Sequence, residues 1–212
     1  MKADFWHDRW QRNQIGFHKS EVHPLLLRFW PMLELSKDAR VLVPLAGKSL
    51  DICWLLEQSH AVTAVELSQL AVEAFFTEQQ WLPIITHRAQ HTVFQHEALE
   101  FWVGDLFALK DENLTDFEGV YDRAALIALP PEMRADYVKT MSVLLKPGAK
   151  YLLISLEYPD DMLSGPPFAI DGQEIARLFQ GSFSIHFHSR HPSEVKGRPC
   201  FETVYILQRL DV

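Results

Sequence analysis

The stretch ARVLVPLAGKS, residues 39–49, decides the fold of this chain. Its first half is a short apolar run with β-branched residues, which is typical of a buried parallel strand. The run ends in a turn at 45–47, and the apolar residues after Asp51 predict a helix. A strand, a tight turn and a helix in this order form the first repeat of a doubly wound, Rossmann-like α/β fold.

The same alternation continues along the chain. Apolar or alternating runs predict strands at 61–65, 92–107 (stopping near Asp105), 118–122 and 151–156. Helical spacing and a Pro-Gly pair predict helices at 70–80, 131–145 and 171–180, and a turn at 146–148. Strands at 183–188 and 201–207 have no helical pattern between them, so we expect an antiparallel hairpin after a mostly parallel sheet.

Length and composition limit the class of protein. The 212 residues predict one domain, and 20 Lys and Arg against 28 Asp and Glu give a net charge of −8, which disfavours nucleic acid. We expect neither a membrane span nor a secretory signal, because apolar runs are short and the first residues are polar. Cys53 and Cys200 are predicted to be free thiols in a reducing, cytoplasmic compartment. Nothing in the sequence demands more than a monomer.

The acidic residue after the second strand points to a nucleoside cofactor. Glu66 lies 19 residues after Gly47, close to the offset of about 20 at which an acid binds a ribose hydroxyl in doubly wound folds. The alternative is a solvated acid that leads into a helix. Pyrophosphate binding needs G-x-G-x-x-G, whereas this turn has one glycine. S-adenosylmethionine, a nucleoside cofactor without phosphates, therefore fits better.

Two further polar residues follow predicted strands. Asp105 is a candidate acceptor for an adenine amino group, or simply a helix-capping aspartate. Arg123 precedes an apolar run and is a candidate to hold a carboxylate or an anionic substrate, with a structural ion pair to Asp122 as the alternative.

The aromatic residues and the ten histidines are the remaining candidates for a site. Trp10 and Phe17 are predicted to cap a flat ligand or a sulfonium, while packing of the first helix on the core is the alternative. His186, His188 and His191 lack partners at metal-ligand spacing, so we expect no metal site. Residues 160–161 are predicted to form a solvated turn. Motifs of serine hydrolases, zinc proteases and dithiol oxidoreductases are missing from the sequence.

Several segments taken together resemble the thiopurine S-methyltransferases, a branch of the class I S-adenosylmethionine-dependent methyltransferases. The resemblance runs through GFH at 16–18, PLAGK at 44–48, VELS at 65–68, FFTEQ at 75–79, DRAAL at 122–126 and GPPF at 165–168, with Trp6, Trp10, Trp54, Pro131, Arg134 and Tyr137. Each segment is short, but their order and spacing are specific.

The resemblance implies methyl transfer from S-adenosylmethionine to a soft nucleophile, with release of S-adenosylhomocysteine. It implies a seven-stranded sheet whose last strand is antiparallel, and an N-terminal lid over residues 1–31. Acceptors would be aromatic or heterocyclic thiols such as thiopurines, or selenium and tellurium compounds. By position, the cofactor contacts would be Trp10, Leu45, Glu66, Arg123 and the backbone at Asp105 and Leu106, with Phe17 on the substrate and Arg123 in catalysis. Arg190 and Arg198 are both candidates for a substrate-side arginine.

Three other functions are compatible with this fold. A nicotinamide oxidoreductase is disfavoured by the turn with one glycine. An O-methyltransferase that uses a divalent metal is disfavoured by the weak metal signature. A non-enzymatic protein that binds a small molecule or a metalloid stays open, although the acids and the arginine at the strand ends favour an enzyme.

Overall fold

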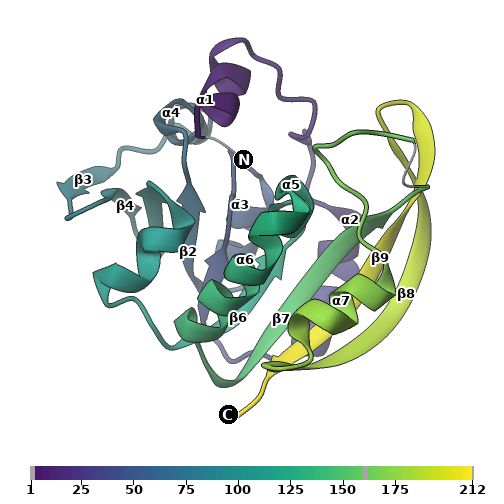
Figure 1. Ribbon diagram of the computed structural model, residues 1–212. Coiled ribbons are helices and arrows are strands. Elements are labelled where there is room, and N and C mark those ends of the chain that lie inside the picture. Colours follow the sequence, from purple (N-terminus) through teal and green to yellow (C-terminus); the bar gives the residue numbers. More distant parts are fainter. Residues whose placement is uncertain (1–2, 160–161, 212) are drawn as a thin grey trace. The chain divides into compact units, whose positions relative to one another are not determined.

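The computed structural model describes residues 3–159 and 162–211, so the turn expected at 160–161 lies outside the described residues. The chain divides into two compact units, Met1–Leu114 and Thr115–Val212. Each unit contains part of an α/β arrangement in which helices follow strands (Figure 1).

The first unit has five strands in the order β3-β4-β5-β2-β1. They are β1 Arg40–Val43, β2 Ala61–Glu66, β3 Ile84–His87, β4 Thr92–His96 and β5 Leu99–Val103. Its helices are α1 Ala3–Gln11, α2 Pro24–Phe29, α3 Asp51–Glu57 and α4 Gln69–Gln79, with short 3-10 helices η1 Trp30–Leu33 and η2 Leu106–Glu112. β2 pairs in parallel with both β1 and β5, as the buried apolar runs predicted.

The stretch 92–107 was predicted to contain one strand, and this prediction is wrong. It forms the antiparallel pair β4 and β5, which turns at Glu97 with a φ of 49°. A glutamate in the left-handed region is uncommon, so no Gly or Asn marked the turn in the sequence. The strand β3 was missed as well, because all four of its residues are exposed and their pattern shows no buried face.

The second unit has four strands in the order β6-β7-β9-β8. They are β6 Phe117–Asp122, β7 Leu145–Glu157, β8 Phe183–Val195 and β9 Arg198–Arg209, and the helices are α5 Ala125–Ala128, α6 Pro131–Leu144 and α7 Gly172–Phe179. β6 and β7 are parallel, and β9 is antiparallel to both β7 and β8. The predicted C-terminal hairpin is confirmed and is longer than expected (Figure 1).

Two expectations about the sheet need correction. The residues 146–148 belong to β7 rather than to a free turn, because the register shift opposite Phe117 and Gly119 absorbs them as a bulge. The described residues contain nine strands rather than seven, since the exposed β3 and its partner β4 add a hairpin at one edge of the first unit. The α/β class, the mostly parallel centre and the antiparallel last strand are confirmed.

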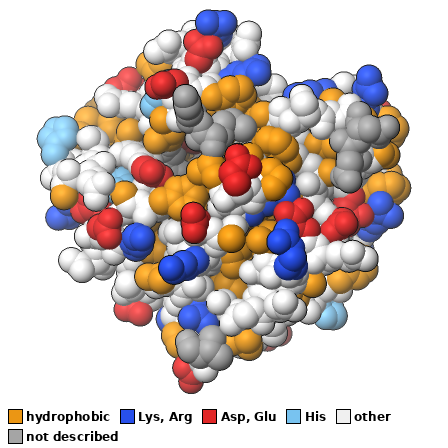
Figure 2. Space-filling view, viewed as in Figure 1, with side chains coloured by type: hydrophobic (Ala, Val, Ile, Leu, Met, Phe, Trp, Pro, Cys, Tyr) orange, Lys and Arg blue, Asp and Glu red, His pale blue; other side chains and the backbone are white. Residues whose placement is uncertain are grey.

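Apolar side chains fill the interior of each unit. Ile52 and Leu55 of α3 are fully buried in the first unit, as are Leu152 and Leu153 of β7 in the second. Among the described residues, the helices are all too short or too polar to cross a membrane. Figure 2 shows Lys and Arg side chains interspersed with Asp and Glu on the face that it presents.

Candidate functional site

Glu66 is the acidic residue that ends β2, and it is held firmly in place. Its side chain is nearly buried, with 7% of the residue exposed. Oε2 accepts a hydrogen bond from the Gly47 backbone N–H at 2.9 Å, and Oε1 accepts one from the Ser68 N–H at 2.9 Å. Burial raises the pKa of Glu66, and the backbone N–H groups oppose that rise. Glu66 is therefore a fixed acceptor and not a solvated acid at the start of a helix.

The turn after β1 brings its backbone against Glu66. Leu45 has a φ of 47° and Gly47 a φ of 57°, so two residues of this turn are left-handed. A left-handed leucine costs about 1–2 kcal/mol, and such strain is often found at functional sites. The Ala46 N–H donates to the Val65 carbonyl at 2.9 Å, which ties the turn to β2.

Three aromatic residues form a cluster beside this turn. The ring of Phe17 lies 5.8 Å from that of Trp6 and 5.6 Å from that of Trp10, edge to face in both cases. A Cβ placed on Gly47 would be 3.3 Å from the Trp10 ring and 4.0 Å from the Phe17 ring. Since α1 contains no buried residue, the two tryptophans do not staple it into the core. The structure thus brings the predicted Trp10, Phe17 and Glu66 together around Gly47.

The turn after β5 lies next to the same acid. The Gly104 N–H donates to the Glu66 carbonyl at 3.0 Å. Asp105 is exposed and caps η2, because its Oδ1 accepts a hydrogen bond from the Phe107 N–H at 3.0 Å. The capping role given above as the alternative is therefore present. The backbone at Asp105 and Leu106 lies one residue beyond the contact with Glu66.

The residue that sequence reasoning missed in this unit is His91. Its ring contacts both Glu112 and the Asp105 carbonyl. The histidines were considered as metal ligands, and one that contacts a backbone turn leaves no sequence signal. Among the described residues, no three His, Cys, Asp or Glu side chains gather in a way that would hold a metal ion.

Asp122 and Arg123 belong to the second unit, at the end of β6. Asp122 is 1% exposed, and its Oδ2 accepts from the hydroxyls of Tyr137 at 2.6 Å and Tyr151 at 2.8 Å. Its Oδ1 accepts from the N–H groups of Ala125 at 3.0 Å and Leu126 at 3.2 Å. Burial raises the pKa of Asp122 and those of both tyrosines. These bonds fix the backbone immediately before Arg123, which is half-buried.

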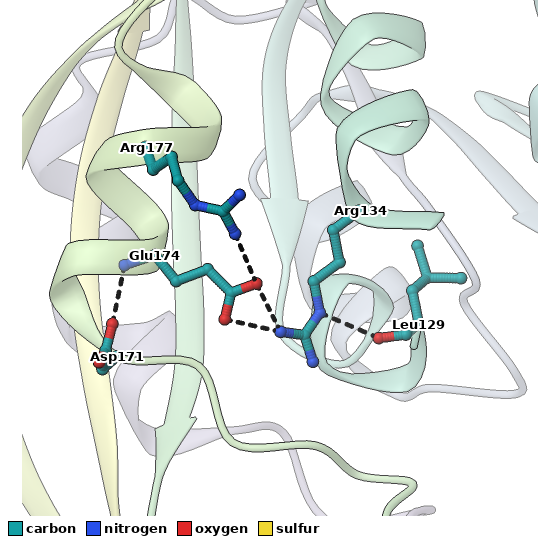
Figure 3. Close-up of polar contacts among 5 residues, drawn as sticks. All are labelled: Leu129, Arg134, Asp171, Glu174 and Arg177. Atoms are coloured by element: carbon teal, nitrogen blue, oxygen red, sulfur yellow. Dashed lines mark hydrogen bonds and ion pairs between the residues drawn. The ribbon is translucent and has the colours of Figure 1, made fainter. Parts of the chain in front are cut away.

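A second buried arginine joins two helices of this unit. Arg134 of α6 is 2% exposed; its Nη1 donates to both oxygens of Glu174 on α7 at 2.8 Å, and its Nε donates to the Leu129 carbonyl at 3.1 Å (Figure 3). The Asp171 carboxylate caps α7 by accepting from the Glu174 N–H at 2.7 Å. This charge-assisted pairing, in which one guanidinium nitrogen contacts both carboxylate oxygens, gives the buried arginine a structural role.

The second unit also contains a groove of about 950 Å³. Its lining includes Glu174, Arg190 and Phe201, whereas Arg198 is not among the lining residues. Arg190 lies 3.8 Å above the Phe201 ring and pairs with Glu157 at 2.9 Å. Of the two arginines considered from the sequence, Arg190 is thus the one that faces a cavity.

Neither cysteine is placed as a ready nucleophile. Cys53 and Cys200 are free thiols, as expected. Burial raises the pKa of Cys53 to about 11, which leaves little thiolate at neutral pH.

Comparison with known proteins identifies the family. The model of the thiopurine S-methyltransferase family matches residues 1–206. The chain belongs to the thiopurine S-methyltransferase family. A thiopurine S-methyltransferase of Pseudomonas fluorescens SBW25 is 54% identical over 179 residues, covering 84% of this chain and 82% of that protein. One from Vibrio cholerae M66-2 is 49% identical over 179 residues, covering 84% and 81%.

Solved structures of low sequence identity share the fold. A 1,6-didemethyltoxoflavin-N1-methyltransferase of Burkholderia thailandensis, solved with bound 1,6-didemethyltoxoflavin and S-adenosylhomocysteine, has a TM-score of 0.71 at 19% identity, over 99% of this chain and 87% of that chain. TehB from Haemophilus influenzae has a TM-score of 0.64 at 12% identity, over 99% and 67%. Membership of the thiopurine S-methyltransferase family confirms the predicted class, an S-adenosylmethionine-dependent methyltransferase of the class I fold.

Proposed function

We propose that this chain transfers the methyl group of S-adenosylmethionine to the sulfur of aromatic or heterocyclic thiols such as thiopurines. The observation that carries the proposal is the buried Glu66 carboxylate, fixed by the Gly47 and Ser68 N–H groups beside the aromatic cluster. The names of the relatives support sulfur as the acceptor atom.

The residues of the first unit suit this cofactor. A carboxylate has about four acceptor positions, so Glu66 can accept from a ribose hydroxyl in addition to its backbone donors Gly47, Ser68 and Leu67. The electron-rich face of Trp10 suits a sulfonium. The other proposed cofactor contacts are Leu45 and the backbone at Asp105 and Leu106. The adenine would lie against the backbone at 105–106. The left-handed turn at Leu45 and Gly47 has the single-glycine form that suits a ligand without phosphates.

Methyl transfer depends on how the chain positions the cofactor and the acceptor more than on acid or base groups. When bound, the cofactor supplies an electrophilic methyl carbon on a positively charged sulfur. The acceptor thiolate forms the new S–C bond as the old one breaks, and both charges disappear together. The chain must therefore hold the acceptor in line and exclude water, with Phe17 contacting the acceptor ring. A thiopurine reaches its thiolate form readily, so a strong base is optional.

Arg123 is proposed to contact the cofactor and to favour the anionic form of the acceptor. Arg123→Ala should then lower turnover at saturating cofactor, whereas Glu66→Ala should chiefly raise the KM for S-adenosylmethionine. Steady-state kinetics with a heterocyclic thiol separate the two effects. An equal loss of turnover in both variants would contradict this division of roles.

Residues 1–31 are proposed to act as a lid within a single functional domain of residues 1–212. The absence of buried residues in α1 supports movement of that helix at small cost, whereas α2, with Leu26 and Phe29 buried, would stay packed and act as the base of the lid. Limited proteolysis near Asn13 should slow when S-adenosylhomocysteine is added. Cleavage at Lys196, in the hairpin between β8 and β9, is the control that should not change. An unchanged rate of cleavage near Asn13 after addition of S-adenosylhomocysteine would contradict a lid.

The groove of the second unit is proposed to bind part of the acceptor through Arg190 and Phe201. Arg190→Ala should raise the KM for an anionic acceptor and leave that for S-adenosylmethionine unchanged, while Arg198→Ala serves as the matched control. The acceptor screen should include selenium and tellurium compounds beside thiols. We propose that the chain works as a monomer in the cytoplasm, where Cys53 and Cys200 stay reduced.

The competing functions have direct tests. Thermal stabilisation by NAD instead of S-adenosylhomocysteine would favour an oxidoreductase. Methyl transfer to a hydroxyl that requires a divalent metal would favour an O-methyltransferase. Ligand binding without turnover of any acceptor would favour a binding protein.

A further inference from the structure

His91 links the β3–β4 hairpin to both ends of η2. It precedes β4 directly and is 3% exposed. Its Nδ1 lies 3.0 Å from Oε1 of Glu112, the last residue of η2, and its Nε2 lies 3.1 Å from the carbonyl oxygen of Asp105, which caps η2. One ring therefore spans the whole segment that follows the Glu66 contact.

Both partners of the ring are hydrogen-bond acceptors. A carboxylate and a peptide carbonyl offer no proton, and a neutral imidazole has one N–H. The ring can make both hydrogen bonds as donors only in its protonated form, with the Glu112 carboxylate as the balancing charge. The hydrogen bond from His91 lowers the pKa of Glu112, which also accepts from the Gln90 N–H at 3.0 Å. Arg88 adds a further positive charge near Glu112.

The His91 ring also packs directly on the backbone of Gly104, which precedes the predicted cofactor contact at Asp105. A Cβ on Gly104 would lie 2.3 Å from Cδ2 of His91 and 3.0 Å from the Gln90 carbonyl, so only glycine fits there. The Gly104 N–H in turn donates to the Glu66 carbonyl at 3.0 Å. On its other side the His91 ring meets Trp102 edge to face, with centroids 5.6 Å apart. His91 is thus confined by packing as well as by hydrogen bonds.

We propose that His91, paired with Glu112, is a positioning residue for the adenine of the cofactor. The C=O and N–H groups of a trans peptide point in opposite directions. By holding the Asp105 carbonyl, His91 therefore sets the direction of the Leu106 N–H and the distance of this peptide from Glu66. The inference rests on the proposed function, because the adenine contact at 105–106 belongs to it. His91 acts on cofactor affinity and not on the methyl-transfer step.

The test compares two variants of the pair with one control. His91→Gln keeps one donor nitrogen but replaces the other with an acceptor oxygen, which faces an acceptor. Glu112→Gln keeps the shape of the side chain but removes its charge. His87→Gln is the control, since His87 is an exposed histidine of β3 that contacts Thr92 Oγ1 at 3.2 Å. We expect both pair variants to raise the Kd for S-adenosylhomocysteine and the KM for S-adenosylmethionine about tenfold, which is about 1.4 kcal/mol. Their kcat at saturating cofactor and their KM for the acceptor should stay within about twofold of wild type.

A merely structural role would not produce this split. Circular dichroism and thermal unfolding establish that the variants fold. If His91→Gln does not fold, the nearly isosteric Glu112→Gln still tests the pair. Folded variants with wild-type affinity, or a kcat loss as large as the loss of affinity, overturn the inference. If the wild-type chain does not bind S-adenosylhomocysteine, the proposed function itself is contradicted. If binding weakens in Glu66→Ala but not in His91→Gln or Glu112→Gln, only the role of His91 is contradicted.

Discussion

Two buried carboxylates end parallel strands in the two units of this chain, and their surroundings differ. Glu66 accepts hydrogen bonds from two backbone N–H groups and lies beside aromatic side chains that are half-exposed. Asp122 accepts from two backbone N–H groups and two tyrosine hydroxyls that are themselves fully buried. The Glu66 carboxylate can thus accept a further hydrogen bond beside the aromatic cluster, whereas the Asp122 carboxylate already accepts four hydrogen bonds inside the core.

The difference separates the acid that we propose to bind the cofactor from a structural one, although both follow a strand in a similar sequence context. A carboxylate that keeps acceptor positions near a surface can bind the hydroxyls of a ligand. A carboxylate that pairs four buried donors instead stabilises the fold, because each of those donors is costly to leave unpaired. Substitutions around Asp122 should therefore lower the stability of the fold, whereas substitutions around Glu66 should chiefly lower the affinity for the cofactor.

The largest effect is expected for Asp122→Ala. It leaves two hydroxyls and two N–H groups without their acceptor, so we expect a loss of about 4 kcal/mol in unfolding free energy and a Tm roughly 10 °C lower. Chemical denaturation measures the loss, and Tyr137→Phe, at about 1 kcal/mol, is the milder control. A loss below that of the control would show that Asp122 is not the structural acid of the pair.

Arg134→Ala sharpens the comparison within the same unit. The substitution removes the donor to the Leu129 carbonyl and leaves Glu174 with only the exposed Arg177 at 3.5 Å, and we expect a loss of about 3 kcal/mol. Lys48→Ala in the first unit is the matched control, because the Lys48–Glu78 pair is partly solvent-exposed and is worth less than about 1 kcal/mol. Equal losses in the two variants, measured by denaturant unfolding, would remove the contrast.

Gly47→Ala tests the side of the comparison that concerns the ligand. Alanine disfavours the φ of 57° by about 1–2 kcal/mol, and its Cβ would press on the Trp10 ring at 3.3 Å. We expect weaker binding of S-adenosylhomocysteine in calorimetric titration, with a smaller loss of stability than in Asp122→Ala. Gly181→Ala is the control, since a Cβ there meets nothing within 4 Å. Unchanged affinity in Gly47→Ala would argue against a cofactor at this turn.

The smallest effect is a pH dependence that Glu66 should produce. Because burial raises its pKa, Glu66 takes up a proton at a higher pH than an ordinary glutamate, whose value is 4.5. Affinity for ligand hydroxyls should therefore fall as the pH decreases through this raised pKa, while Glu66→Gln should show a flat profile. Folding has the opposite sign: the stabilising contribution of protonated Glu66 is complete below the unfolded pKa and is lost as the pH rises through the folded pKa. A wild-type profile as flat as that of Glu66→Gln would contradict the role of this carboxylate.

The sequence predicted those parts of the molecule in which local pattern and packing agree. The buried strands β1, β2 and β6 and the helices α3, α4, α6 and α7 have apolar periodicity that matches their burial. The strand β3 escaped prediction because its exposed residues leave no pattern, and β4 and β5 were predicted as one strand because the turn at Glu97 lacks the usual residue types. The acid Glu66 was found from its spacing to Gly47, whereas His91 was missed, since contacts made through a backbone carbonyl depend on tertiary structure.

The most direct test of the account is a calorimetric titration of the wild-type chain and of Glu66→Ala with S-adenosylhomocysteine. We predict one-to-one binding to the wild type and binding at least about tenfold weaker, or about 1.4 kcal/mol, in Glu66→Ala at a temperature where both are folded. Equal affinity in the two proteins would contradict the assignment of the site, and no binding to the wild type would contradict the proposed function.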